Sequence, residues 1–184
     1  MGENMEKREK EIKFQNLAIY FFTCAFIGWI LEMVYGFMVF GHFVDRGFLY
    51  GPICPIYGYG AVAMIVIIDA IQKKNVNVAG KFVIITVVFT LLEYLASLVL
   101  ELIFHQRWWD YTNEILNING RVCLIFSLMF GIIGLAFAEW IYKPSNRLIN
   151  KIRKIIPTKF IWLILIDLLI VLNVDTVFSI IRYI

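Results

Sequence analysis

The chain has 184 residues, 61% of them apolar and 16% aromatic, and its mean hydropathy is +0.78. A water-soluble domain of this size needs far fewer apolar side chains to fill its core, so the composition excludes that class and predicts an integral membrane protein. The formal net charge of +3 arises from Lys and Arg residues that gather between apolar runs. We therefore expect contact with the lipid bilayer and not with nucleic acid.

Five apolar runs are long enough to cross a hydrocarbon layer of ~30 Å, which takes about 20 helical residues. They predict an all-α, polytopic membrane helix bundle. Residues 1–14 precede them as a charged cytoplasmic tail of helical character, and no secretory cleavage site follows, so we expect this segment to be retained. Residues 15–184 are then a single transmembrane domain. The expected spans cover residues 15–40, 52–71, 82–104, 122–142 and 160–181.

The distribution of positive charge predicts the orientation of these spans. Thirteen of the 17 Lys and Arg residues fall in the N-terminal tail and in the second and fourth connections. We therefore expect a multi-pass protein of the cell membrane, with a cytoplasmic N-terminus and an external C-terminus. The fourth connection, KPSNRLINKIRK, is expected to lie on anionic lipid as an amphipathic segment, or alternatively to dock a cytoplasmic partner.

The first outer connection enters the second span through glycine and proline, in the stretch RGFLYGPICPIYGYG (residues 46–60). We expect Pro52 and Pro55 to occupy the first turns of that span, where a missing amide donor costs least. Gly58 and Gly60 lack side chains and would let another helix or a ligand approach the backbone. A re-entrant entry that lines a cavity is the alternative, because irregular backbone at membrane depth must lie against protein or water.

Seven carboxylates lie within or at the ends of the expected spans, whereas no Lys or Arg lies in their interiors. An unpaired carboxylate in lipid is unfavourable, so each must be protonated, paired, at an interface or in a wet cavity. We expect Asp69, Glu139 and Asp175, near span ends, to be solvated. Glu32 and Glu93 are roughly 12 to 16 Å from the outer ends of their spans, at 1.5 Å per residue. The seven are Glu32, Asp69, Glu93, Glu101, Glu139, Asp167 and Asp175.

Glu93, Ser97 and Glu101 are spaced four residues apart and predict one polar stripe on the third helix. In one interpretation the stripe joins helices through salt bridges to arginines that fold in from the outer loops. In the other, the acids line a pocket for a cationic or proton-coupled ligand, which the arginines close. Asp167 would complete such a pocket or tie the fifth span to the bundle. The candidate substrate-binding residues are Glu32, Glu93, Glu101, Arg46, Arg107 and Arg121.

The first four spans align as two copies of a helical hairpin, about residues 15–71 and 82–142. Both copies run in the same sense, which predicts a weak parallel repeat about an axis along the membrane normal. Glu32 and Glu93 would then face a shared central region, and the helix at 160–181 lies outside the repeat. Chance similarity between two aromatic-rich hairpins is the alternative. The aligned pairs include Phe21 with Phe82, Glu32 with Glu93, Arg46 with Arg107, Tyr50 with Tyr111, Gly51 with Gly120 and Cys54 with Cys123.

Sequence motifs for independent catalysis are missing. The sequence contains no GxxxxGK[ST] phosphate loop, no zinc-type cysteine spacing and no nucleophile–histidine–acid arrangement. We therefore expect no cofactor, no metal and no catalytic residue, and ATP-driven transport would need another subunit. Cys54 and Cys123 are expected to be free thiols, with a bridge between them as the alternative.

Several segments in one order resemble the signature of a bacterial family, the putative ABC-transporter type IV membrane proteins. These segments are RGFLYGPICPIYGYG, EYLASLVLE (residues 93–101), and RWWDY followed by NINGRVCLIFSLMFG. The resemblance covers roughly residues 18–142 and implies a permease-like protein that works with a separate ATP-binding subunit. It supplies no substrate and no catalytic residue.

The expected function is therefore a permease-like membrane component of a transporter for a small molecule. A homodimer is expected because two hairpins and one helix make a thin pathway. One alternative is a subunit that captures substrate without forming the whole pathway. Another is a membrane-embedded enzyme acting on a phosphate-bearing lipid, in which the arginines hold phosphate and Glu93 or Glu32 acts as general base.

Overall fold

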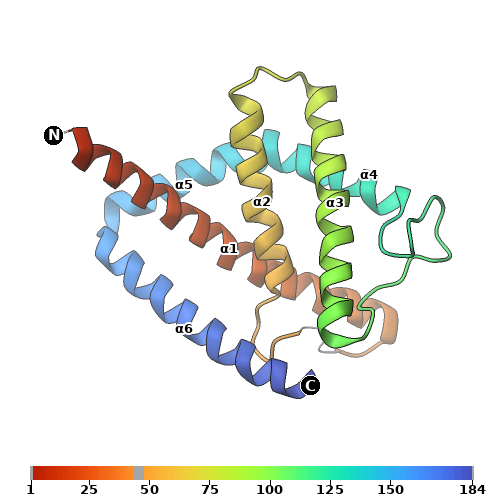
Figure 1. Ribbon diagram of the computed structural model, residues 1–184. Helices are drawn as coiled ribbons and strands as arrows, with labels where there is room; N and C mark the ends of the chain where they lie inside the picture. The colour runs from red at the N-terminus through yellow and green to blue at the C-terminus, as the bar shows by residue number, and fades with distance from the viewer. Residues whose placement is uncertain (1, 44–47, 184) are drawn as a thin grey trace. The chain divides into compact units, whose positions relative to one another are not determined.

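The computed structural model describes residues 2–43 and 48–183, with side chains from residue 5 to residue 182 (Figure 1). This part is all-helical, apart from an isolated antiparallel bridge between Ile118 and Val122. Five helices in it are long and apolar enough to cross a membrane, which confirms the predicted number of spans. The elements are α1 (Gly2–Phe40), α2 (Pro55–Gln72), α3 (Val78–Phe104), α4 (Leu124–Ala136), the π-helical turn η1 (Phe137–Ile141), α5 (Tyr142–Ile155) and α6 (Thr158–Tyr183).

The charged N-terminal tail is helical, as its sequence predicts, and it continues without a break into the first span as α1. Glu6 and Lys10 lie one turn apart and form an exposed ion pair of 2.6 Å. Such a pair supports a helix only weakly in water. The helical character of the tail therefore rests mainly on its continuity with the apolar part of α1.

The second helix begins at Pro55, where the missing amide donor has no intrahelical partner to lose. The prediction that Pro52 also lies in the helix is wrong. Residues 51–54 are non-helical because their backbone is bonded elsewhere: the Gly51 amide donates to Asp175 of α6, and the Cys54 amide donates to the Ala25 carbonyl of α1. The irregular backbone before α2 is thus held against protein.

The third helix has defined caps at both ends. The Asn77 side chain accepts a hydrogen bond of 2.8 Å from the Gly80 amide at the N-terminus. At the C-terminus, His105 adopts the left-handed conformation (φ 55°), and its amide donates to the Glu101 carbonyl. The caps fix where the α3–α4 loop, residues 105–123, leaves the helix.

The chain divides into two compact units, which we describe separately. Unit 1 comprises Met1–Ile65 and Ser145–Ile184, and unit 2 comprises Val66–Pro144. In unit 1, α1 and α6 share a core in which Phe21 and Phe22 pack against Ile161 and Leu165. In unit 2, α3 packs against α4.

Glycines allow close helix packing within each unit. A Cβ atom at Gly58 of α2 would lie 2.7 Å from the Phe21 ring of α1, so the predicted close approach at this glycine is confirmed. In unit 2, a Cβ at Gly131 of α4 would lie 2.6 Å from the Phe82 ring and 2.1 Å from the Thr86 hydroxyl of α3. A side chain at either glycine would collide with these neighbours unless they shifted.

Candidate functional site

The predicted polar stripe of α3 is bound by an arginine from the α3–α4 loop. Arg121 is 8% exposed, and one of its terminal nitrogens donates to the hydroxyl of buried Ser97 at 3.2 Å. Its other terminal nitrogen lies 2.5 Å from Oε2 of Glu101. The stripe thus contacts an arginine that folds in from the loop, in the way that the structural interpretation of the sequence predicts.

A second arginine binds the same acid from the more exposed side. Nε of Arg107 lies 3.3 Å from Oε1 of Glu101, and one of its terminal nitrogens donates to the Asn119 carbonyl at 3.4 Å. Glu101 therefore has one arginine on each carboxylate oxygen. Its negative charge is neutralised inside unit 2.

The α3–α4 loop positions both arginines through its own hydrogen bonds. The Tyr111 amide donates to the Gly120 carbonyl at 2.7 Å, and the Trp109 indole donates to the Arg121 carbonyl at 2.9 Å. The Thr112 hydroxyl and amide both donate to Asp110, and these bonds lower the pKa of the Asp110 carboxyl. The loop is thus a defined structure that presents arginines to α3.

Glycine is required at the tip of this loop. Gly120 has φ 68°, and a Cβ there would lie 2.5 Å from both Oδ1 of Asp110 and the hydroxyl of Thr112. A side chain would be strained by the backbone conformation and would collide with the turn at Asp110. The aligned Gly51 of unit 1 has a different neighbour: its added Cβ would lie 2.9 Å from the Asp175 carboxylate.

Glu93 differs from Glu101 because no cation contacts it in the described part of the chain. Its Oε1 accepts a hydrogen bond of 3.3 Å from the Tyr111 hydroxyl, whereas its Oε2 is buried and has no hydrogen-bond partner there. Burial, followed by the nearby charge of Glu93, raises the pKa of Tyr111, so this phenol stays a donor near neutral pH. Tyr111 is fixed by stacking on Phe126 at 4.6 Å. Glu93 is therefore oriented but not charge-compensated.

The remaining candidates lie in unit 1 or outside the described residues. Glu32 of α1 is half-buried and accepts a hydrogen bond of 2.7 Å from the Tyr57 hydroxyl of α2. Arg46 lies outside the described residues. Because Glu32 and Glu93 belong to different units, their proposed apposition stays a prediction.

Unit 1 contains a charged contact that sequence reasoning missed. The Asp175 carboxylate of α6 accepts hydrogen bonds from the amides of Tyr50 and Gly51, at 2.9 and 2.8 Å. Arg182 donates to the Phe48 carbonyl at 3.0 Å and lies 4.4 Å from the centre of the Tyr50 ring. Asp175 therefore binds the α1–α2 loop, whereas we expected it to be simply solvated.

Two further acids expected at solvated positions also have partners. In unit 2, Glu139 of η1 pairs with Lys81 of α3 at 2.5 Å, and Asp69 accepts a hydrogen bond of 2.8 Å from Tyr142. These contacts tie helix ends together. Asp167 of α6, by contrast, is exposed.

The described residues were searched for metal-binding clusters and for disulfide bonds. They include no group of three or more His, Cys, Asp or Glu side chains placed to hold a metal ion. Cys24, Cys54 and Cys123 are free thiols. What the α3 stripe offers instead is a neutralised acid, Glu101, and an uncompensated one, Glu93, on the same helix.

Comparison with known proteins gives one match. The family described as Putative ABC-transporter type IV matches residues 19–180, which is most of the chain. Neither a curated protein nor a solved structure matches the chain. The match extends the resemblance seen in the sequence through the fifth span. The chain therefore belongs to the Putative ABC-transporter type IV family and is a multi-pass membrane component of transporter type.

Proposed function

We propose that the chain is the permease-like membrane component of a transporter for a small molecule, energised by a separate ATP-binding subunit. The family match and the five apolar helices support a transporter component. The sequence has no phosphate-binding loop with which to use ATP itself. A partner subunit would have to supply that step.

The uncompensated carboxylate of Glu93 carries the more specific part of the proposal. Glu93 lies eleven residues before the end of α3, about 16 Å inside the span at 1.5 Å per residue. A carboxyl group at that depth needs a proton or a counter-charge, and in the described residues no cation contacts Glu93 and no hydrogen bond reaches its buried Oε2. We infer that Glu93 binds a cationic or proton-donating group of the substrate.

The other candidate residues have supporting parts in this proposal. Arg107 and Arg121 neutralise Glu101 and so hold the α3–α4 loop beside the substrate site. Their guanidinium groups are engaged with Glu101, which supports a positioning role more than direct binding of a phosphate group. Under the predicted repeat, Glu32 and Arg46 would contribute the equivalent groups from the first hairpin.

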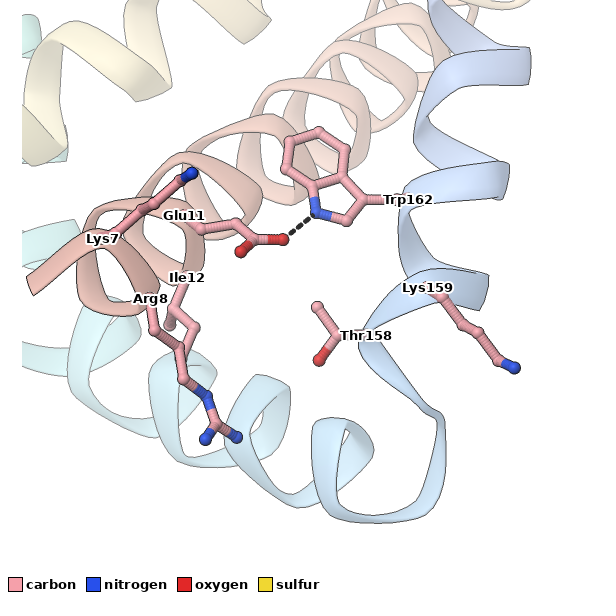
Figure 2. Close-up of a pocket in the computed structure, with 7 residues that line it drawn as sticks. All are labelled: Lys7, Arg8, Glu11, Ile12, Thr158, Lys159 and Trp162. Atoms are coloured by element: carbon pink, nitrogen blue, oxygen red, sulfur yellow. Dashed lines mark hydrogen bonds between the residues drawn. The ribbon is translucent and has the colours of Figure 1, made fainter. Parts of the chain in front are cut away.

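Orientation follows from charge, with the N-terminus and α5 in the cytoplasm and the C-terminus outside. A hollow of about 470 Å³ lies between the ends of α1 and α6 that are predicted to be cytoplasmic (Figure 2). It is bordered by Lys7, Arg8 and Lys159. Glu11 accepts a hydrogen bond of 2.7 Å from the Trp162 indole across it. Cations and a tryptophan at one level suit the headgroup layer of an anionic leaflet.

The amphipathic α5 helix is the proposed contact for the ATP-binding subunit. It has Arg153 and Lys154 in its last turn and buries Ile149, while Leu148 and Ile155 are 59% and 82% exposed. Exposed apolar side chains among basic ones fit either a protein partner or anionic lipid. The family match favours the protein partner.

Gentle native purification, followed by mass spectrometry of bound protein and small molecules, tests this function. We expect an ATP-binding subunit to co-purify with the wild type and with Glu93→Gln. A small molecule should remain on the wild type and be lost from Glu93→Gln, while the matched variant Glu101→Gln retains some of it. A tightly bound phosphate-bearing lipid with no ATP-binding subunit would overturn the proposal and favour a membrane enzyme.

A further inference from the structure

The α3–α4 loop folds back beside the half of α3 that ends at Phe104 (Figure 1). Three loop side chains bond to α3 residues that lie seven to eleven positions before Phe104. At 1.5 Å per residue, these contacts are about 10 to 16 Å from the end of the helix. Part of the loop is therefore level with the span. The bonds join Tyr111 to Glu93, Asn119 to Tyr94 and Arg121 to Ser97.

The same loop carries an exposed apolar tip, which consists of Ile115, Leu116 and Ile118. Their side chains are 67%, 71% and 55% exposed. Single exposed apolar residues are ordinary on a protein surface, whereas three within four positions of one loop indicate contact with an apolar phase or a partner. The tip has a hydrogen-bonded support, since the Ile118 amide donates to the Val122 carbonyl at 2.9 Å.

The backbone around the apolar tip is bonded within unit 2. The Asn117 side chain donates to the carbonyls of Thr112 and Glu114, at 2.9 and 3.0 Å. The Leu124 amide of α4 donates to the Ile115 carbonyl at 3.3 Å. A loop in water can leave such carbonyls to solvent, whereas a loop in contact with lipid must satisfy them internally. The bonding of this loop therefore suits a lipid environment.

The backbone conformation of Leu116 adds a second indication. Leu116 has φ 52°, in the left-handed region that disfavours a leucine. Asn119 has φ 54°, and there the chain has asparagine, which tolerates this conformation. A strained residue persists where its side chain has a use that offsets the strain. Transfer of a leucine side chain from water into lipid is such a use.

The apolar tip continues the exposed apolar face of α4. Ile115 is bonded to Leu124, the first residue of that helix. Leu124, Leu128 and Ile132 are spaced four residues apart on one face and are 40%, 39% and 62% exposed. Trp109 belongs to the same loop, and tryptophan is enriched where a membrane meets water. The surface that spans the membrane thus extends onto the tip.

We propose that the apolar tip inserts into the lipid leaflet at this end of α3, at the boundary between headgroups and acyl chains. Lipid is its occupant because the loop is level with the span and its tip continues the face of a spanning helix. Exposed Glu114, next to the tip, stays among headgroups and water. The predicted orientation makes this the outer leaflet. The loop is then held from two sides, by lipid at its tip and by Glu101 at its arginines.

Spin labels in reconstituted vesicles test the insertion. In a variant whose three cysteines are replaced by serine, labels at Ile115→Cys and Ile118→Cys are compared with one at Asn113→Cys, an exposed polar position of the same loop. The vesicles contain phosphatidylcholine and phosphatidylglycerol. Collisions with oxygen report lipid, and collisions with a water-soluble nickel chelate report water. We expect the oxygen-to-nickel ratio to be at least about tenfold higher at both tip positions than at Asn113.

Two other outcomes would overturn the proposal. A tip ratio equal to that at Asn113, with frequent nickel collisions, would mean that the tip lies in water. Few collisions with either reagent would mean that protein covers the tip, and in vesicles of the purified chain that protein is unit 1 or a second copy.

Replacement of Leu116 tests whether its side chain holds the tip in lipid. Leu116→Asn suits φ 52° but removes an apolar side chain, whereas Leu116→Met keeps one of similar size. We expect Leu116→Asn to lower the oxygen-to-nickel ratio at Ile118→Cys at least about threefold relative to Leu116→Met. Equal ratios in the two variants would show that the apolar side chains do not anchor the loop, against the proposal.

Discussion

The two interhelical loops that follow α1 and α3 are held by opposite means. In unit 2 the loop supplies the charge, because Arg107 and Arg121 fold back onto Glu101 of the preceding helix. In unit 1 the charge comes from another helix, because Asp175 of α6 binds the amides of the loop. Asp175 of the fifth span therefore holds the first loop in place, as Arg107 and Arg121 hold the second.

The two hairpins are more alike in their helix packing. Each second helix begins at the residue after an aligned cysteine, Cys54 before α2 and Cys123 before α4. Each first helix has an aligned phenylalanine packed against a glycine of the second, Phe21 in unit 1 and Phe82 in unit 2. The phenylalanines are aligned, whereas the glycines that they contact, Gly58 and Gly131, are not, so the repeat stays a prediction.

The largest expected effect on stability comes from truncating Arg121. Arg121→Ala removes a buried stem and leaves the buried Ser97 hydroxyl without its donor. We expect a loss of about 2–5 kcal/mol in the free energy of unfolding, measured by denaturation in detergent. Arg121→Met keeps much of the packing and should lose less. Equal stability of Arg121→Ala and wild type would show that the loop does not depend on this arginine.

Removing the Asp175 carboxylate should release the first loop and leave the second unchanged. Asp175→Ala leaves the Tyr50 and Gly51 amides without their acceptor, which costs about 1–3 kcal/mol. Hydrogen exchange at residues 48–54 should accelerate, while exchange at residues 105–123 serves as the internal control. Unchanged exchange at 48–54 would contradict the described contact.

Replacing Gly120 tests the strain in the second loop. Gly120→Ala must adopt φ 68° and meet the Asp110 and Thr112 side chains, so we expect a loss of about 1–2 kcal/mol. Gly41 also has positive φ, 73°, but has nothing within 4 Å of an added Cβ. Gly41→Ala should therefore cost less, and a larger loss at Gly41 would refute the role given to the Gly120 contacts.

Arg107 should matter least to stability. It is partly exposed and adds a second cation to an acid that Arg121 already neutralises. Exposed ion pairs add little to stability because water and salt screen them. We expect no resolvable change in the melting temperature for Arg107→Gln, and a change as large as that of Arg121→Ala would contradict this ranking.

Sequence reasoning predicts the spans well because a hydrocarbon layer imposes a length and an apolar composition that each run displays. One of its two interpretations of the α3 stripe, salt bridges from loop arginines, matches the contacts of Arg107 and Arg121 with Glu101. It misses the contact of Asp175 with the first loop, since the partners are more than 120 residues apart and the donors are backbone amides, which every residue except proline carries. It also misses the tyrosine partners of Glu32 and Glu93, because no sequence pattern pairs a tyrosine with an acid on another element.

The central claim is that the two acids of α3 differ, with Glu101 neutralised and Glu93 left for a ligand. A hydrophobic carbodiimide, which modifies protonated carboxyls in membranes, tests it directly when labelling at each acid is followed by mass spectrometry. We predict that Glu93 is labelled at least about tenfold faster than Glu101, and that the co-purifying ligand slows labelling at Glu93 alone. Equal labelling of the two acids, or faster labelling of Glu101, would contradict the account.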